Sequence, residues 1–285
     1  MKKVLQTEEA GLTDIFETPP VKNPFFYVWC IFAKIFCFTL FGAGSLVLGI
    51  IALPVMKLLW PRKKDFQRHS RKLVSALFKF FVFIMTASGA FCLKIEGKEV
   101  LSNLGGCVVV ANHPSLLDVV MLVSQIPNAD CIVNASLKKN IVSAVVAYLY
   151  ITNDCEHEQM MEKCRSTIAD GNALIIFPEG TRSKPWGQNP YKKGAARVAL
   201  AAGCPVVPVF FGGNDKRGLR KKDPMLMFNT TDKYRYHLYV KDFIDSRDYM
   251  DLPAPAAAKR MTQKMHELLC YENNWNYILG KNPLL

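Results

Sequence analysis

The sequence predicts an α/β fold: a layered domain whose mostly parallel central sheet is flanked by helices, preceded by an N-terminal hydrophobic membrane-anchoring helix or helix pair. Two observations lead to this prediction. Short apolar runs alternate with helix-like segments from residue 107 onward, as they do when helices connect parallel strands. A far longer apolar tract precedes them, and its length suits a membrane better than a sheet.

Composition limits the class of partner. Half of the 285 residues are apolar and the net charge is +12, which favours an acidic partner such as nucleic acid, anionic lipid or a phosphorylated substrate. The sequence has no zinc-finger spacing, no basic helix followed by heptads and no aromatic strand motif of RNA-binding domains. We therefore expect lipid and phosphate ligands, and no nucleic acid.

The nine cysteines stand singly, with no C-x-x-C pair and no histidines at zinc spacing. This pattern is typical of reduced structural thiols in a cytosol-facing protein, so we expect neither disulfides nor a metal site. The adjacent Glu156, His157 and Glu158 would point to different sides of a helix, which argues against a shared metal ion.

The N-terminal part divides into a polar tail, residues 1–24, and a membrane-anchoring part, residues 25–93. Ile35 to Met56 is a run of 22 residues without charge. At 1.5 Å per residue it spans about 33 Å, enough to cross the ~30 Å hydrocarbon core. Pro61 to Lys72 then carries six Lys or Arg. By the positive-inside rule, this basic cluster and everything after it face the cytoplasm. We expect the anchor to lie in the inner, cytoplasmic membrane.

A second apolar tract, Leu73 to Leu93, is interrupted by Lys79. Ser75, Lys79 and Thr86 fall on one narrow stripe of a helix, which favours a helix lying at the membrane interface over a second crossing. The sequence leaves one alternative open: residues 25–93 could form a re-entrant helical pair that never crosses the bilayer.

Residues 94–250 have the pattern of the layered domain, and residues 251–285 close the chain with a helix whose regular part is expected at 255–278. Short apolar runs bounded by turn residues predict buried strands. We expect strands at 107–112, 131–134, 173–177 and 206–211, with helices at 116–125, 139–149, 156–170 and 194–202. Ligands of such sheets bind beyond the carboxyl ends of the strands.

The first expected strand runs into the segment Asn-His-Pro-Ser-Leu-Leu-Asp, residues 112–118. Pro114 is favoured at a first helical position, so we expect the helix to begin there and to leave His113 just outside it. His113 can then fold back toward Asp118, which would fix its tautomer and leave the second ring nitrogen free to take a proton. The alternative is a plain helix start, with a polar histidine and an acidic first turn.

The strand expected at 173–177 runs into a similar cluster, Phe-Pro-Glu-Gly-Thr-Arg-Ser, residues 177–183. Gly180 allows close approach to the backbone, and the guanidinium of Arg182 suits a phosphate or a carboxylate. Alone, this segment is more often a turn with a surface ion pair. Because both clusters would emerge at the same edge of a parallel sheet, we expect them to form one site.

Four blocks in this order carry a family resemblance: "NHPSLLD", "FPEGTRS", "YKKG" at 191–194 and the strand "CPVVPV" at 204–209. Over residues 95–215 the chain resembles the glycerolipid acyltransferase family, in particular its 1-acyl-sn-glycerol-3-phosphate acyltransferases. The resemblance implies an O-acyltransferase of phospholipid biosynthesis. It would move a fatty acyl group from an acyl-CoA or acyl-carrier-protein thioester to the free hydroxyl of a lysophospholipid, most directly lysophosphatidate, giving phosphatidate.

The resemblance also implies partners and roles. The partners are the two substrates, membrane lipid and, for one kind of donor, acyl-carrier protein, with no cofactor besides the donor. His113 would be the general base for the acceptor hydroxyl, and Asp118 would orient it. Glu179, Gly180, Thr181 and Arg182 match the block that binds the acceptor's glycerol phosphate, Lys192 a basic residue after it and Pro208 a packing proline. We expect backbone N–H groups at a helix start to stabilise the oxyanion.

The chain departs from the family where a strand usually ends in an arginine that helps to hold the acceptor's phosphate, because Asn153-Asp154 stand there. Either Arg182 and Lys192 hold the phosphate alone, or the acceptor is another lyso-lipid, with a different phospholipid or an amino-acid head group. A non-catalytic membrane adaptor that binds anionic lipid is the hypothesis from another class. The five basic residues of segment 214–223 fit a solvated face or a dock for CoA phosphates, carrier protein or anionic lipid.

Overall fold

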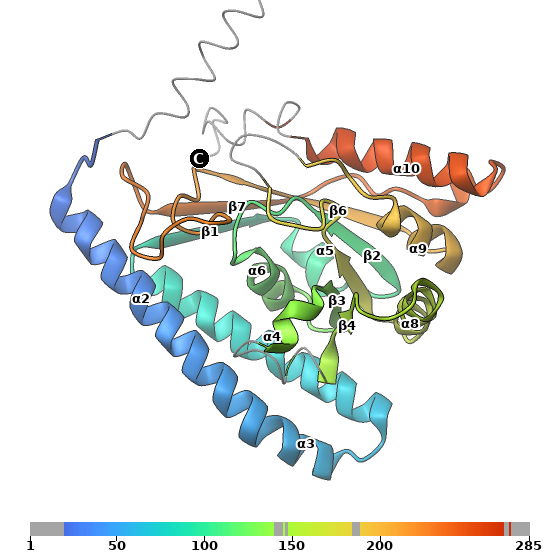
Figure 1. Ribbon diagram of the computed structural model, residues 1–285, viewed down its shortest axis with the longest axis horizontal. Helices are drawn as coiled ribbons and strands as arrows, with labels where there is room; N and C mark the ends of the chain where they lie inside the picture. Colours follow the sequence, from blue (N-terminus) through green and yellow to red (C-terminus); the bar gives the residue numbers. More distant parts are fainter. Residues whose placement is uncertain (1–19, 140–144, 146–147, 184–188, 271–273, 275–285) are drawn as a thin grey trace, which may run out of the picture.

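The computed structural model describes residues 20–139, 145, 148–183, 189–270 and 274 (Figure 1). Within these residues one sheet has the strand order β1-β7-β6-β2-β5-β3-β4. Its strands are β1 (Phe91–Glu96), β2 (Cys107–Ala111), β3 (Ala129–Val133), β4 (Ile151–Thr152), β5 (Ala173–Ile176), β6 (Val206–Gly213) and β7 (Tyr234–Val240). Neighbouring strands run parallel except β6 and β7, which are antiparallel. The prediction of a mostly parallel sheet is confirmed.

Helices cover both faces of the sheet (Figure 1). They are α4 (Lys63–Ala87), α5 (Lys98–Ser102), α6 (Asp118–Gln125), α8 (His157–Ala169), α9 (Gly194–Ala202) and α10 (Ala254–Leu269), with the 3₁₀ turns η2 (Ala135–Lys139) and η3 (Ser246–Tyr249). Strand β2 alternates between two cores: Val109 and Ala111 pack with α4 and α6, and Val108 and Val110 pack with α8, α9 and α10. Both faces of β2 are therefore dry, and only its carboxyl end is left to hold polar chemistry.

The four expected strands are all present, but three further strands were missed. In β1 the apolar Phe91, Leu93 and Ile95 alternate with Cys92, Lys94 and Glu96. The predicted strands were recognised as continuous apolar runs. Strand β1 instead alternates apolar with more polar residues, a pattern that such runs do not show. Strand β1 begins at Phe91, so the layered domain starts inside the tract expected to be helical up to residue 93. Strand β7 begins with the same alternation in sequence, although Arg235 is its one exposed residue, and β4 is too short to carry a pattern.

The expected helices at 156–170 and 194–202 correspond to α8 and α9. The helix expected at 139–149 and the polar tail lie mostly outside the described residues. The C-terminal helix α10 ends at Leu269, and most of the remainder of the expected 255–278 helix also lies outside them. All nine cysteines lie in the described part of the chain as free thiols, seven of them buried.

The N-terminal apolar tract forms one helical run, α2 (Pro24–Val47), the π-helical turn η1 (Leu48–Ala52) and α3 (Leu53–Leu59). The side chain of Asn23 caps its start by accepting from the N–H of Phe26 at 3.0 Å. Pro54 has no N–H to donate to the preceding turn, and the wider π turn lies directly before it. The chain then reverses direction into α4. Phe78 and Phe81 of α4 pack against Phe41 of α2.

Within the described residues, Pro24–Leu59 is the helix long and apolar enough to cross a membrane by length and composition. A core helix of a soluble protein would be mostly buried, whereas 17% of its most apolar window is buried here. Large side chains left exposed along α2, α3 and α4 include Phe25, Phe32, Ile50, Leu58, Phe80 and Phe83. An uncovered apolar surface of this extent is typical of a site that contacts a membrane or another protein.

The polar stripe expected between Leu73 and Leu93 is not a single exposed face. Ser75 is buried, whereas Lys79 is exposed. Helix α4 instead lies against the sheet domain through Val74, Val82 and Met85. The helix is therefore part of the layered domain on one side and carries exposed Phe80 and Phe83 on another.

A buried ion pair fastens α4 to the sheet. The Nη2 of Arg71 donates to Oδ2 of Asp130 on β3 at 2.8 Å, with side-chain exposures of 6% and 3%. Asp130 also accepts from Thr167 of α8 at 2.9 Å and from the N–H of Cys131 at 2.8 Å. The carboxylate thus connects helices on opposite faces of the sheet. Breaking such a pair is far more costly than breaking one in water.

Replacing Arg71 by Met is expected to lower the free energy of unfolding by about 3 kcal/mol, because it leaves a buried carboxylate without its cation. Burial raises the pKa of Asp130, and Arg71, Thr167 and Cys131 oppose this. Without Arg71 the folded-state pKa rises further above the unfolded value. Stability of R71M is then retained at low pH and lost as pH rises through that pKa. Denaturant titrations in detergent at about pH 5 and about pH 8 measure both effects.

Lys64→Met is the matched control on the same helix. Lys64 pairs with Asp170 at 2.6 Å, but its side chain is 78% exposed. We expect a loss below about 1 kcal/mol for this pair. Equal losses in the two variants would contradict the anchoring role of Arg71.

Candidate active site

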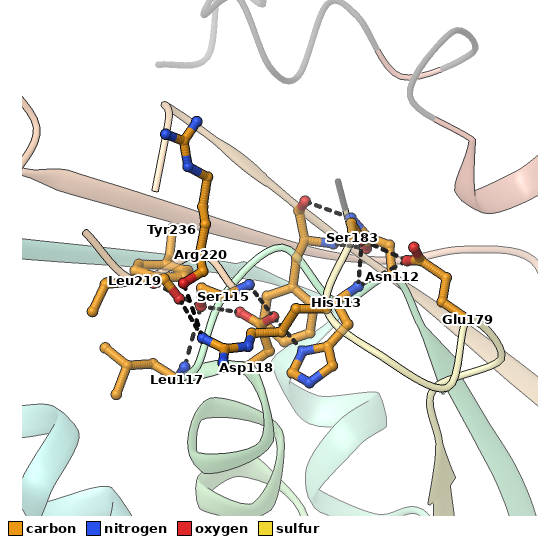
Figure 2. Close-up of polar contacts among 12 residues, drawn as sticks. Asn112, His113, Ser115, Leu117, Asp118, Glu179, Ser183, Leu219, Arg220 and Tyr236 are labelled. Atoms are coloured by element: carbon orange, nitrogen blue, oxygen red, sulfur yellow. Dashed lines mark hydrogen bonds and ion pairs between the residues drawn. The ribbon is translucent and has the colours of Figure 1, made fainter. Parts of the chain in front are cut away.

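The carboxyl ends of β2 and β5 place the two predicted clusters side by side (Figure 2). The strands pair in parallel, with Val110 opposite Ile176. The chain leaves β2 toward His113 and leaves β5 toward Glu179, so both segments emerge at one edge of the sheet. The expectation that the clusters share one edge is confirmed. Asn112 fixes the end of β2 by exchanging two hydrogen bonds with the backbone of Phe211 on β6, at 3.0 and 2.7 Å.

His113 and Asp118 form a hydrogen-bonded pair. Nδ1 of His113 lies 2.8 Å from Oδ2 of Asp118 (Figure 2). Helix α6 begins at Asp118, one turn later than the start expected at Pro114, and residues 115–117 form a turn. The delay arises because Asp118 binds backward to that turn, accepting from the N–H of Ser115 at 2.7 Å. His113 lies outside the helix, as expected, and reaches Asp118 for this reason.

The carboxylate of Asp118 is fully buried, and its second oxygen accepts from the hydroxyl of Ser115 at 2.5 Å. That hydroxyl in turn accepts from Tyr236 of β7 at 2.9 Å. Three donors stabilise the ionised form, which a buried carboxylate requires. Sequence reasoning missed Ser115 and Tyr236. Ser115 lies inside the quoted motif, but nothing in the sequence places the distant Tyr236 near it.

Lys216 lies directly behind Tyr236, with its ammonium 4.5 Å from the ring centre. It is 4% exposed and donates to the carbonyls of Gly212, Asn214 and Arg235. Burial lowers the pKa of Lys216 to about 7, against the opposing effect of Asp118 and Asp215. Arg217 is buried as well. The solvated-face interpretation of segment 214–223 is therefore wrong for these two residues, while Lys221 and Lys222 are exposed.

The imidazole of His113 is oriented from both sides. Its ring stacks on Phe177, with centroids 4.2 Å apart, and its side chain is 16% exposed. With Nδ1 facing Asp118, the tautomer places the proton there and leaves Nε2 as an acceptor. Nε2 has no hydrogen-bond partner among the described residues. The arrangement can take a proton from a hydroxyl that approaches Nε2.

Glu179 braces the two clusters against each other. Its carboxylate is 3% exposed and accepts from four protein groups: the N–H of His113 at 3.3 Å, the hydroxyl of Ser183 at 2.5 Å, and the N–H and side-chain amide of Asn189 at 3.2 and 2.9 Å. The N–H of Ser183 donates back to the carbonyl of His113 at 2.7 Å. The oxygens of Glu179 are thus engaged within the protein, and the residue positions His113.

The other members of the second cluster form a basic rim. Gly180 has a φ of +68°, and a Cβ there would lie 2.8 Å from Nζ of Lys192, so the ammonium lies over the glycine. Thr181 accepts from Lys221 at 3.0 Å. Arg182 donates through Nη1 to the carbonyls of Leu219 and Arg220, both at 3.1 Å. Its Nε and Nη2 groups have no partner within the described part of the chain.

The turn before α6 does not supply the expected oxyanion donors. The N–H groups of Ser115, Leu116 and Leu117 donate to Asp118, to the carbonyl of Leu219 and to the hydroxyl of Ser115, respectively. Pro208 lies inside β6, where it is paired with Val110 of β2.

Asn153 stands at the end of β4, two strands away from β5, and accepts from the N–H of Ala135 at 2.9 Å. Its exposed side chain holds the turn into η2. The arginine that the family resemblance leads one to expect is therefore replaced by a turn-stabilising amide. Among the described residues, no group of three or more His, Cys, Asp or Glu could hold a metal ion.

Comparison with known proteins relates the chain to acyltransferases. Residues 92–212 match the family model described as Acyltransferase. The chain is 32% identical over 131 residues to a 1-acyl-sn-glycerol-3-phosphate acyltransferase of Cocos nucifera, covering 42% of this chain and 41% of that protein. It is 30% identical over 181 residues to a chloroplastic 1-acyl-sn-glycerol-3-phosphate acyltransferase of Brassica napus, covering 60% and 52%. The chain spans about half the length of these curated relatives, or less.

The fold also matches the crystal structure of the 1-acyl-sn-glycerophosphate acyltransferase PlsC from Thermotoga maritima. The TM-score is 0.60 at 19% identity, over 84% of this chain and 95% of that one. The predicted resemblance to the glycerolipid acyltransferase family is confirmed by the match of residues 92–212 to the Acyltransferase model and by these relatives.

Glu179→Gln is expected to lower the free energy of unfolding by about 2 kcal/mol, because an amide offers one acceptor oxygen and turns an N–H₂ toward donors. The backbone N–H groups of His113 and Asn189 should then exchange with solvent faster. Hydrogen exchange followed by mass spectrometry of peptides spanning 112–118 and 189–194 measures this.

The control is Glu162→Gln on the surface of α8, where the carboxylate pairs with Arg165 at 64% side-chain exposure. We expect a stability change within about 0.5 kcal/mol and no change in exchange near His113. Faster exchange near His113 in both variants would contradict a bracing role for Glu179.

Proposed function

We propose that the protein is a membrane-associated O-acyltransferase that moves a fatty acyl group from a thioester to the free hydroxyl of a lysophospholipid. The observation that carries the proposal is the His113–Asp118 pair at the end of β2, which leaves Nε2 without a hydrogen bond in the described residues and lies inside the segment that matches the Acyltransferase model. The names of the curated relatives support lysophosphatidate as the acceptor and phosphatidate as the product.

The proposed reaction begins with proton transfer. As the acceptor hydroxyl attacks the carbonyl carbon of the thioester, Nε2 of His113 takes its proton. The imidazolium that forms is stabilised by Asp118, whose buried carboxylate lies 2.8 Å from Nδ1. Such general-base help contributes about 10²- to 10⁴-fold to the rate.

The tetrahedral intermediate then collapses by breaking the carbon–sulfur bond. The thiolate leaves, since thiols have a pKa of about 8.5 and need no strong acid, and the imidazolium returns its proton to sulfur. An ester bond has formed, a thioester bond has broken, and His113 is regenerated. The reaction balances without a redox step, so the proposal needs no cofactor beyond the acyl donor.

The basic rim is the proposed seat of the acceptor's phosphate. Lys192 lies over Gly180, Lys221 is bound to Thr181, and Arg182 keeps Nε and Nη2 unpaired within the described chain. These three cations can replace the arginine that Asn153 does not supply. A glycine in this position lets the phosphate approach the backbone closely.

A second acceptor class remains in the proposal because of Asn153. Without that arginine, the site has one cation fewer to favour a phosphate head group. A lyso-lipid with another head group is therefore at a smaller disadvantage in binding. The acyl donor is proposed to be acyl-CoA or acyl-acyl-carrier protein, and exposed Lys221 and Lys222 suit the negative charge of either.

We also propose that the apolar surface of α2, α3 and α4 holds the protein in the cytoplasmic membrane with the catalytic domain facing the cytoplasm. The basic start of α4, which includes Lys63 and Lys64, supports this orientation. Both lipid substrates are then delivered from the bilayer in which the protein lies.

His113→Ala is expected to reduce acyl transfer at least about 10²-fold, because it removes the proposed general base. The assay is release of free thiol from oleoyl-CoA by purified protein, with and without oleoyl-lysophosphatidate. Flotation with vesicles should show unchanged membrane association.

The control for this variant is His157→Ala, at the exposed start of α8, which should keep full activity. Full activity of H113A would overturn the mechanism. If the wild-type protein binds anionic vesicles but releases no thiol with any donor, the adaptor hypothesis replaces the enzyme.

Acceptor preference is the second test of the proposed function. In a panel of lysophosphatidate, lysophosphatidylglycerol, lysophosphatidylethanolamine and lysophosphatidylcholine, we expect the highest kcat/KM for lysophosphatidate. Lys192→Met should lower that kcat/KM about tenfold, because it removes one cation from the phosphate seat. A clear preference for another acceptor in the wild-type protein would replace lysophosphatidate in the proposal.

Lys193→Met is the neighbouring control, since Lys193 is exposed just before α9. It should leave kcat/KM for lysophosphatidate within about twofold. Similar losses in K192M and K193M would indicate a general effect of net charge instead of a seat for the phosphate.

A further inference from the structure

A single buried charge interrupts the N-terminal apolar helix. Lys34 is the charged residue of α2, and it is 0% exposed. Its ammonium donates to the carbonyl of Gly218 at 3.3 Å and to the carbonyl of Met227. An unpaired ammonium would be very unfavourable here, so these contacts with the sheet domain are what make a lysine tolerable in this position.

The partner of Lys34 is the β6–β7 loop, residues 214–233, which lies beside the first half of α2 (Figure 1). Gly218 has a φ of +87°, and a Cβ there would lie 1.9 Å from the carbonyl oxygen of Met227 and 3.0 Å from Nζ of Lys34. The loop is therefore packed on the ammonium with no room for a side chain. Tyr27 of α2 adds a weaker contact, accepting from the N–H of Phe228 at 3.4 Å.

The next residue of the same loop contacts the active site. The carbonyl of Leu219 accepts from the N–H of Leu116 at 3.0 Å and from Arg182 at 3.1 Å. Leu116 belongs to the turn between His113 and Asp118, and Arg182 belongs to the basic rim. Two consecutive carbonyls, those of Gly218 and Leu219, thus join α2 to both clusters of the site.

We propose that Lys34 is a positioning residue for acceptor binding: through the β6–β7 loop it fixes the orientation of Arg182. The inference rests on the proposed function and deepens it. Helix α2 is then part of the scaffold of the phosphate seat as well as a membrane anchor. A lysine in an apolar helix is explained by the loop that it holds.

The contacts specify what is lost without the ammonium. The carbonyls of Gly218 and Met227 would lose a charged donor in a buried place, and the loop would relax to find other partners. Both hydrogen bonds that Arg182 makes within the described residues are donated to carbonyls of that loop, those of Leu219 and Arg220. Its guanidinium would then be held in several orientations, and affinity for the acceptor's phosphate would fall.

The test compares Lys34→Met with Lys79→Met. Both variants replace a lysine in an apolar stretch of helix by an unbranched apolar side chain, but Lys79 on α4 is exposed. For K34M we expect KM for lysophosphatidate to rise about tenfold, equivalent to ~1.4 kcal/mol, with kcat and KM for oleoyl-CoA nearly unchanged. K79M should match the wild type in all three constants.

A merely structural role predicts a different result. A destabilised protein would have a smaller active fraction, which lowers kcat and leaves KM unchanged. That outcome, or equal constants for K34M and K79M, would overturn the proposal. If K34M does not fold, Tyr27→Phe, which loosens the same loop, must raise KM for lysophosphatidate in the same direction, and an unchanged KM would overturn it.

A second readout does not depend on activity. Lys221 and Lys222 are exposed on the β6–β7 loop, so trypsin can report how firmly the loop is held. In K34M, cleavage after these residues should be several-fold faster than in K79M, as followed by mass spectrometry. Equal cleavage rates would overturn the contact between Lys34 and the loop, whereas absence of acyl transfer by the wild-type protein would overturn the proposed function alone.

Discussion

Two buried carboxylates determine how the site is built. Asp118 and Glu179 are both almost inaccessible to water, and an ionised carboxylate in such a place must be surrounded by donors. Asp118 accepts hydrogen bonds from the His113 ring and from the N–H and hydroxyl of Ser115. Glu179 accepts from the backbone N–H of His113 and from the side chains of Ser183 and Asn189. Asp118 therefore holds the side chain of His113, and Glu179 holds its backbone.

The sheet makes this arrangement possible because it brings the two carboxylates to one edge. Parallel pairing of β2 with β5 lets both strands end at the same edge. Both faces of these strands are packed in the two hydrophobic cores, so their polar residues are left at that edge. Strand β7 runs the other way and contributes Tyr236 from the far side of β6, where its hydroxyl supports Ser115. The reversed edge of the sheet thus has a chemical consequence, since it delivers a donor that a fully parallel continuation would not.

The β6–β7 loop shows how buried polar groups connect distant parts of the chain. Lys34, Lys216 and Arg182 each donate to backbone carbonyls of the loop or of its flanking strands. Cations in these positions are tolerated because the carbonyls would otherwise lack partners, so each group satisfies the other. The N-terminal apolar helix, the loop and the active site are consequently one packed unit.

Much of the fold could be predicted from the sequence because its signal is local. The apolar runs that became β2, β3, β5 and β6 are short and continuous, and the helices α8 and α9 have clear periodicity. Strands β1 and β7 were missed because their side chains alternate and because their pairing partners lie far apart, as with Phe91 and Tyr234. The start of α6 was misplaced because Asp118 holds the preceding turn, an interaction that outweighs the preference of Pro114 for a first helical position.

The sequence by itself determined the fold class, the family resemblance and the chemistry-bearing motifs, because these reside in short segments whose residues act together. Only the tertiary structure decided what each residue does within the site. It turned Glu179 from a predicted ligand contact into a brace, and it buried two cations of a loop that was open to a solvated interpretation. It also gave Lys34 a partner 184 residues away. The physical reason is that burial and long-range donor–acceptor pairing depend on which segments meet, and no local pattern encodes that.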